Sequence, residues 1–208
     1  MDHYTGIAPL YEPLLGGILG PLRRAVTTAA AQAARDAGVA PERLRMLDCC
    51  CGTGGQLRLL AKSFSAFGLD RSPPMLARAL DLAGPRLVRA DAAQIPFAAD
   101  TFDAASVSLA LHEMGRPLAL AALGELSRVV RPGGSLLLVD WASPLPWYTV
   151  PGGHMAERTA GREHYRNFRA YQAAGGLPDL CRAAGLAMRE TGRFCLGALV
   201  LARCRLEG

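Results

Sequence analysis

Three aspartates recur at a regular interval in the first half of the chain, and each follows a short apolar run. Asp48, Asp70 and Asp91 are separated by 22 and 21 positions, which is the length of one strand and one helix together. The carboxyl ends of parallel strands share one edge of a sheet, where open α/β sheets bind their ligands. We therefore expect these carboxylates to line a ligand site, and the alternative for each is a turn or helix-capping role.

A glycine-rich turn follows the first of these aspartates. Gly52-Thr53-Gly54-Gly55 leads from the apolar run into the next helix, and glycines there let backbone amides approach a ligand closely. A carboxylate about 20 residues farther along, here Asp70, can take both hydroxyls of a ribose. The turn and the carboxylate together predict a cofactor that contains adenosine.

The main alternative for such a turn is NAD. Its fingerprint, G-x-G-x-x-G, ends in a glycine where this chain has Leu57, and Cys50 fills the first glycine position of a G-x-G-x-G pattern. Asp48 precedes the turn, and a carboxylate there repels a pyrophosphate but attracts an ammonium or a sulfonium group. The charge therefore favours S-adenosylmethionine, which carries both cations.

The elements that must position these residues alternate between strand and helix. Apolar runs predict strands over 45–49, 66–70, 86–90, 102–109 and 135–140. Helical patterns come between them, over 56–62, 74–82 and 117–130, and a further helix is expected near 177–184. Two last strands, 186–194 and 198–204, are close enough to form an antiparallel hairpin. This alternation predicts a parallel sheet that is covered by helices on both faces.

The chain is expected to be a single domain over 1–208, since its length leaves little room for a second core. Residues 1–40 predict an amphipathic N-terminal helical cap. Residues 141–176 are rich in proline, glycine and aromatic side chains, and they predict an insertion with short helices.

Four motifs in order resemble those of the class I S-adenosylmethionine-dependent methyltransferases. Residues 47–54 are similar to the family's L-D-h-G-C-G-T-G turn, where h is hydrophobic, and residues 68–76 to its G-h-D-x-S-x-x-M-L block. Residues 91–103 resemble D-A-x-x-L-P-F…F-D, and residues 128–134 resemble R-V-L-K-P-G-G. The resemblance spans roughly residues 45–140, and it departs from the family at Cys50, where glycine is usual.

The resemblance is closest to the type 11 group, which contains quinone-biosynthesis and phospholipid N-methyltransferases. Residues 4–12 are also similar to the Y-D-x-h-A-x-x-Y-D opening of that group. The implied fold is Rossmann-like: a doubly wound, mostly parallel sheet of seven strands in the order 3-2-1-4-5-7-6, with the last strand antiparallel.

The resemblance also implies the cofactor contacts. Asp48 and the backbone of 52–54 would hold the methionine end, Asp70 the ribose hydroxyls and Asp91 the adenine amino group. Met75 is expected either in the adenine pocket or in the core. The full set expected to bind S-adenosylmethionine is Asp48, Cys50, Gly52, Gly54, Asp70, Arg71, Met75, Asp91, Ala92, Ser108 and Leu109.

Methyl transfer from a sulfonium mainly requires that donor and acceptor be aligned and that water be excluded. A base helps where the acceptor carries a proton. His112, which follows the fourth strand at the cofactor edge, is the catalytic candidate, and a structural role is its alternative. In this family the segment 141–176 covers the substrate. The side chains expected around the substrate are Tyr4, Tyr11, Asp140, His154 and Tyr165.

The sequence favours a small or lipid-like acceptor, such as a quinone, a phospholipid amine or another small molecule. The chain has neither the Asn/Asp-Pro-Pro-aromatic motif after the fourth strand nor the Pro-Cys pair of nucleic-acid methyltransferases, so a nucleic-acid partner is disfavoured. Two alternatives stay open: an RNA or protein methyltransferase, and a protein that binds the cofactor without catalysis, as a sensor or a partner subunit.

The net charge of +5 comes almost wholly from arginine, since Lys62 is the only lysine. The excess has two interpretations: a coding bias, or an anionic partner such as phospholipid headgroups, which would bring peripheral contact with a membrane. No stretch reaches the roughly 18 apolar residues that span a bilayer and no signal peptide is recognisable, so we expect a cytoplasmic location. The oligomeric state is not predicted.

The six cysteines include no C-x-x-C pair, and Cys49, Cys50 and Cys51 are consecutive. Consecutive side chains of a strand point to opposite faces, so these three thiols cannot all face one ion. We expect reduced, buried thiols and no metal site.

Overall fold

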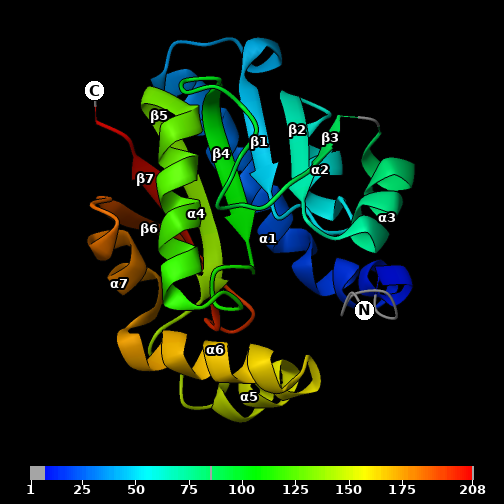
Figure 1. The fold of residues 1–208 in the computed structure, drawn as a ribbon, viewed down its shortest axis with the longest axis vertical. Coiled ribbons are helices and arrows are strands. Elements are labelled where there is room, and N and C mark those ends of the chain that lie inside the picture. The colour runs from blue at the N-terminus through cyan, green and yellow to red at the C-terminus, as the bar shows by residue number, and fades with distance from the viewer. Residues whose placement is uncertain (1–7, 85, 208) are drawn as a thin grey trace.

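The structure is a computed structural model, and it describes residues 8–84 and 86–207. Within them, seven strands form one sheet in the order β3-β2-β1-β4-β5-β7-β6 (Figure 1). The strands are β1 (Arg45–Cys49), β2 (Ser65–Asp70), β3 (Leu87–Arg89), β4 (Phe102–Ser108), β5 (Val130–Trp141), β6 (Met188–Phe194) and β7 (Leu199–Arg205). Strands β1 to β5 pair in parallel, whereas β7 runs antiparallel to both β5 and β6. The predicted fold class is confirmed.

Helices cover both faces of this sheet, and Figure 1 shows α4 in front of it and α1 behind. The helices are α1 (Ala8–Asp36), α2 (Gly55–Leu60), α3 (Pro73–Ala83), α4 (Arg116–Val129), α5 (Val150–Thr159), α6 (Arg162–Ala174) and α7 (Gly176–Ala183), with a 3-10 turn at Pro41–Arg43. None of those in the described part of the chain is long and apolar enough to cross a bilayer.

Strand alternation divides the core between the two faces. Met46 packs with α1 and α2 on one face, while its neighbour Leu47 packs with α4 on the other. In β5, Leu136 and Leu138 pack on the α4 face with Leu47, and Leu137 packs on the α1 face with Met46. Because both faces are buried, these strands need apolar residues at most positions, which explains why continuous apolar runs predicted them.

Strand β5 begins at Val130, five positions before the run that predicted it. Residues 131–134, R-P-G-G, look like a turn in sequence, yet Val130 before them pairs with Phe102 and Ser135 after them pairs with Ala104, so the register shifts at this point. Gly134 permits this arrangement, because a Cβ there would lie 2.6 Å from the backbone oxygen of Asp103. The local turn signal therefore yields to the pairing with β4.

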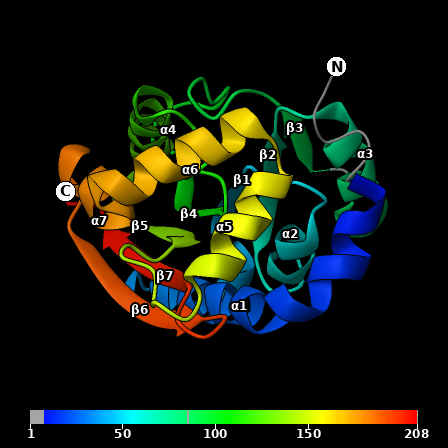
Figure 2. The ribbon, with the colours of Figure 1, turned by 90° about the horizontal axis from the view of Figure 1, so that it is seen from below.

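The segment 141–176 contains α5 and α6, which lie beyond the carboxyl ends of the strands (Figures 1 and 2). Figure 2, which views the molecule from this end, shows both helices in front of the sheet. Asn167 ties α6 to the loop after β4, because its side-chain amide donates to the backbone oxygen of Glu113 at 2.7 Å. That this segment covers the substrate, and that the whole chain is one domain, stay predictions.

Candidate functional site

A cavity of about 430 Å³ lies at the carboxyl edge of the sheet. Residues at the ends of β1, β2 and β4 line it, together with residues of α1 and α6. Of the predicted cofactor residues, all but Gly54 line it: Asp48, Cys50, Gly52, Asp70, Arg71, Met75, Asp91, Ala92, Ser108 and Leu109. The structure therefore brings together the side chains that the sequence placed along one edge.

Asp48, near the end of β1, is buried, and one of its two carboxylate oxygens makes no hydrogen bond to the described residues. Its Oδ1 accepts a hydrogen bond from the Ser106 hydroxyl at 2.7 Å, whereas Oδ2 has no hydrogen-bond partner among the described residues. Burial raises the pKa of this carboxyl to about 7. An unsatisfied carboxylate oxygen is costly away from water, and an ammonium group bound in the cavity would satisfy it. The site therefore fits the amino-acid end of S-adenosylmethionine.

The turn after β1 keeps a glycine-like backbone although cysteine replaces glycine. Cys50 has φ 57°, in the left-handed region where Gly52 and Gly54 also lie. A side chain in that region costs roughly 1–2 kcal/mol. Gly54 faces α3 rather than the cavity, since a Cβ there would approach the Cα and Cβ of Ala79 to 3.0 Å. Its part is to let the turn and α3 pack closely.

Asp70, at the end of β2, joins the turn to the start of α3. One oxygen accepts from the backbone N–H of Gly52 at 2.8 Å and the other from the backbone N–H of Ser72 at 2.9 Å. Burial raises the pKa of Asp70, and the two backbone donors oppose that rise. Each carboxylate oxygen has a second lone pair, so the hydroxyls of a ribose in the cavity could be bound without breaking either contact.

Asp91 and Ala92, which come shortly after β3, also line the cavity. Asp91 is exposed, and its carboxylate accepts from the backbone N–H of Ala93 at 2.9 Å. Ala92 is buried. Met75, in α3, is buried and also lines the cavity, so the core and the pocket interpretations of this side chain both describe its position.

A contact between α1 and the glycine turn was not predicted from the sequence. The Arg23 guanidinium donates to both oxygens of Glu12, at 2.7 and 2.9 Å, and the Thr53 hydroxyl donates to the same carboxylate at 2.7 Å. Burial would raise the pKa of Glu12, but these hydrogen bonds outweigh it and hold the pKa below its usual value. The signal in the sequence is the spacing of 11, which returns to the same face of a helix after three turns.

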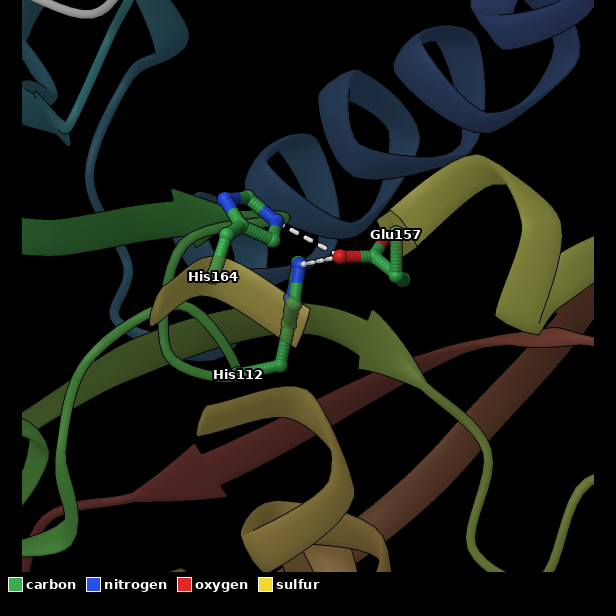
Figure 3. Close-up of side chains that lie close together, drawn as sticks. All are labelled: His112, Glu157 and His164. Atoms are coloured by element: carbon green, nitrogen blue, oxygen red, sulfur yellow. Dashed lines mark ion pairs between the residues drawn. The ribbon is translucent and has the colours of Figure 1, made fainter. Parts of the chain in front are cut away.

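His112 is buried and does not line the cavity. Its Nδ1 lies 2.6 Å from Oδ1 of Asp140, and its Nε2 lies 3.3 Å from Oε2 of Glu157. His164 lines the cavity instead, and its Nε2 lies 2.5 Å from the same glutamate oxygen (Figure 3). Burial would lower the pKa of His112, but the carboxylates of Asp140 and Glu157 raise it well above the usual value.

The predicted substrate residues that the structure describes with their side chains, Asp140, His154 and Tyr165, do not line the cavity. Asp140 is buried against His112, and His154 and Tyr165 contact each other, with Nδ1 and the phenol oxygen 2.9 Å apart. Tyr11 lies in α1, but the structure does not describe its side chain, and Tyr4 lies outside the described residues. Four other side chains line the cavity near α6: Glu113, Glu163, His164 and Asn167. Of these, only His164 was considered from the sequence, as part of the segment expected to cover the substrate.

Comparisons with known proteins add independent information. Residues 46–134 match a family model described as a methyltransferase domain. The chain is 31% identical, over 181 residues and 74% of each sequence, to the demethylmenaquinone methyltransferase of Lactiplantibacillus plantarum. It is 37% identical over 109 residues to an uncharacterized methyltransferase of Synechocystis, and it covers 51% of that protein. The chain thus spans about half the length of the first curated relatives that it matches.

Solved structures show the same fold. The magnesium protoporphyrin IX methyltransferase of Synechocystis, solved with bound SAH, superposes with a TM-score of 0.66 at 20% identity, over 91% of this chain and 85% of that one. A possible histamine N-methyltransferase of Thermotoga maritima superposes with a TM-score of 0.67 at 18% identity, over 99% of each chain.

Proposed function

The chain belongs to the class I S-adenosylmethionine-dependent methyltransferases, in the quinone-related group, and we propose that it transfers a methyl group from S-adenosylmethionine to a small quinone-like acceptor. The observation that carries the proposal is the unpartnered oxygen of Asp48 beside a cavity at the carboxyl edge of the sheet. It is a site for a cationic ligand, and the adjoining glycine turn and Asp70 suit the adenosine part of the same molecule.

We assign the cofactor contacts residue by residue. Asp48 and the backbone of Gly52 hold the amino-acid end, and Asp70 holds the ribose hydroxyls. Asp91 accepts from the adenine amino group. Ser108 and Leu109, at the end of β4, line the cavity, and Leu109 has φ 55°, a second strand end in the left-handed region. We propose that this kink turns backbone groups toward the methionine part of the cofactor.

The acceptor class is supported by the relatives. They include demethylmenaquinone methyltransferases and a 2-phytyl-1,4-naphtoquinone methyltransferase of Synechococcus elongatus, which is 36% identical over 111 residues. The bound cofactor supplies an activated methyl group, so the protein has to align a flat acceptor ring against it and exclude water. His112 is shielded from the cavity, so any part that it has in methyl transfer acts through Glu157 and His164.

Exposed apolar side chains also support contact with a membrane. Trp147 and Leu196 are 83% and 79% exposed, and Tyr148 packs edge-on against Trp147 with ring centroids 5.6 Å apart. We call Trp147, Tyr148 and Leu196 the apolar rim. Aromatic residues of this kind favour the membrane–water interface, and a net charge of +5 attracts anionic headgroups. The cytoplasmic location expected from the sequence stays a prediction.

The proposal is tested with S-adenosylmethionine that carries a labelled methyl group. We expect label to appear in a short-tailed, reduced naphthoquinone, and we expect Asp70→Asn to weaken binding of S-adenosylhomocysteine by at least about tenfold, because a charged hydrogen bond contributes roughly 1.5–3 kcal/mol. Tight cofactor binding without transfer to quinone, phospholipid or small-amine acceptors would instead indicate a protein that binds the cofactor without catalysis.

A further inference from the structure

Two histidines and a glutamate from three separate segments converge on one point (Figure 3). His112 follows β4, Glu157 lies in α5 and His164 lies in α6. Each offers one atom that could bind a metal ion, and these three atoms all lie within 4.8 Å of one another. The Nε2 atoms of His112 and His164 lie 3.3 and 2.5 Å from the same carboxylate oxygen, Oε2 of Glu157.

The remaining polar atoms of His112 and Glu157 are held by other residues. Nδ1 of His112 lies 2.6 Å from Asp140, whose second oxygen accepts from the backbone N–H of His112 at 3.1 Å. Oε1 of Glu157 accepts from the indole N–H of Trp141 at 2.8 Å. These contacts aim the free nitrogen of His112 and Oε2 of Glu157 at each other. A carboxylate that orients an imidazole in this way is the usual support of a metal-binding histidine.

The cluster is shielded from water on most sides. The side chains of His112 and Glu157 are 3% and 9% exposed, and the rings of Phe168, Trp141 and Tyr171 pack edge-on around His112. His164 is 14% exposed and lines the cavity, so the cluster meets the cavity on its side. Apolar surroundings of this kind limit solvent access to a metal site and set its local dielectric.

Buried carboxylates are stabilised by positive charge nearby. Asp140 and Glu157 lie against His112, and the Glu113 carboxylate lies 3.8 Å from Nδ1 of His164, so carboxylates surround both imidazoles. A divalent cation between the imidazoles would offset this negative charge. Two imidazole nitrogens and one carboxylate oxygen are also the protein donors of a well-known class of catalytic zinc sites, which leave a fourth position for water or a substrate.

We propose that His112, Glu157 and His164 bind a divalent transition-metal ion, with Zn²⁺ as the best chemical match to these donors. Asp140 and Trp141 orient the ligands, and the remaining coordination position lies on the side of His164, toward the cavity. The cysteine pattern predicted no metal site, because cysteine spacing carries no information on histidines that the fold brings together. The proposal goes beyond methyl transfer and does not depend on it.

The test uses residues 1–208 without an affinity tag, after dialysis against a chelator. Titration calorimetry with Zn²⁺ should give one ion per chain, and Co²⁺ should give the visible absorption of a low-symmetry site with nitrogen and oxygen donors. His164→Ala and Glu157→Gln should each weaken Zn²⁺ binding by more than about 100-fold, because the first removes a ligand and the second replaces an anionic ligand with a neutral amide. Asp140→Asn should weaken binding by about 10- to 100-fold, as loss of a supporting carboxylate does.

His154→Ala is the matched control, because His154 also lies in α5 but contacts Tyr165 instead of the cluster. It should bind Zn²⁺ as the wild type does. Binding of S-adenosylhomocysteine and the melting temperature of each chelated variant establish that the fold is intact, and neither measurement requires methyl transfer. Absence of stoichiometric Zn²⁺ binding by the wild type would overturn the proposal, as would equal affinity of the wild type and His164→Ala.

Discussion

At the scale of single residues, the Asp48 carboxyl couples cofactor binding to pH. Its pKa is raised to about 7 by burial, so in the free protein it is mostly protonated below pH 7. A protonated carboxyl cannot pair with an ammonium group. We expect the Kd of S-adenosylhomocysteine, which keeps that ammonium, to rise as pH falls below 7, by up to about tenfold per pH unit. Calorimetry from pH 8 to pH 6 measures this.

Asp48→Asn should bind S-adenosylhomocysteine weakly and with little dependence on pH. The same substitution should stabilise the free protein at high pH. The pKa of Asp48 is higher in the folded protein than its unfolded value of about 4, because burial favours the protonated carboxyl. The folded state is therefore most stable below pH 4, and its free energy of unfolding falls as pH rises from 4 to 7. We therefore expect a higher melting temperature than wild type at pH 8 and no gain near pH 4. A less stable variant at pH 8 would contradict this assignment.

Cys50 offers a second test at this scale, because its φ of 57° suits glycine better than any branched side chain. Cys50→Gly removes the strain but adds freedom to the unfolded chain, so we expect a change in stability below about 1 kcal/mol and retained cofactor binding. Cys50→Val should lose roughly 1–3 kcal/mol, because a β-branched side chain fits this conformation poorly. Denaturant unfolding compares them, and equal stability of the two variants would argue against a left-handed turn.

At the scale of elements, the ion pair between Arg23 and Glu12 fastens α1 to the glycine turn through Thr53. Arg23→Met keeps the aliphatic stem but leaves the half-buried Glu12 without its cation. We expect a loss of about 1–2 kcal/mol and faster hydrogen exchange in α1. Hydrogen–deuterium exchange of the free protein measures this.

Arg24→Met is the matched control for this prediction, because Arg24 is exposed on the next position of α1. Its exchange in α1 should equal that of the wild type. If Arg23→Met and Arg24→Met behaved alike, the ion pair would have no part in holding the helix.

The strands could be predicted from the sequence because most are buried on both faces. The run at 45–49 coincides with β1, and the run at 66–70 misses only the first residue of β2. The early start of β5 could not be predicted, because R-P-G-G is locally a turn pattern and only the pairing of Val130 with Phe102 extends the strand across it. The order of the strands came from the family resemblance, since periodicity alone does not specify which strands are neighbours.

One side of the cavity could be predicted from the sequence, and the other could not. Its cofactor side lies at strand ends, so residues such as Asp48 and Asp70 belong to short motifs that are readable in sequence. The side near α6 depends on contacts between distant segments, such as Asn167 with Glu113, and no motif links those positions. The prolines and glycines of 141–176 also obscured the helical pattern of α5, which contains Gly152 and Gly153.

At the scale of the whole molecule, the apolar rim and the cavity lie at the same end. Trp147 and Tyr148 follow β5, and Leu196 follows β6, which is parallel to β5 because both run antiparallel to β7. The two loops are adjacent, since a Cβ at Gly197 would lie 3.4 Å from the ring of Pro146. An acceptor with a long apolar tail could therefore stay in a bilayer while its ring reached the cavity.

This arrangement predicts that membrane contact affects long-tailed acceptors selectively. The double substitution Trp147→Ala and Leu196→Ser should lower the fraction of protein that sediments with anionic vesicles, because burial of each side chain contributes roughly 1–3 kcal/mol. It should raise the KM for a long-tailed quinone in vesicles by about tenfold or more, with the KM for a tail-less analogue in solution unchanged. Leu80→Ser is the control, since Leu80 is exposed on α3, outside the rim. An equal effect of this control, or unchanged sedimentation of the double variant, would show that the rim does not bind membranes.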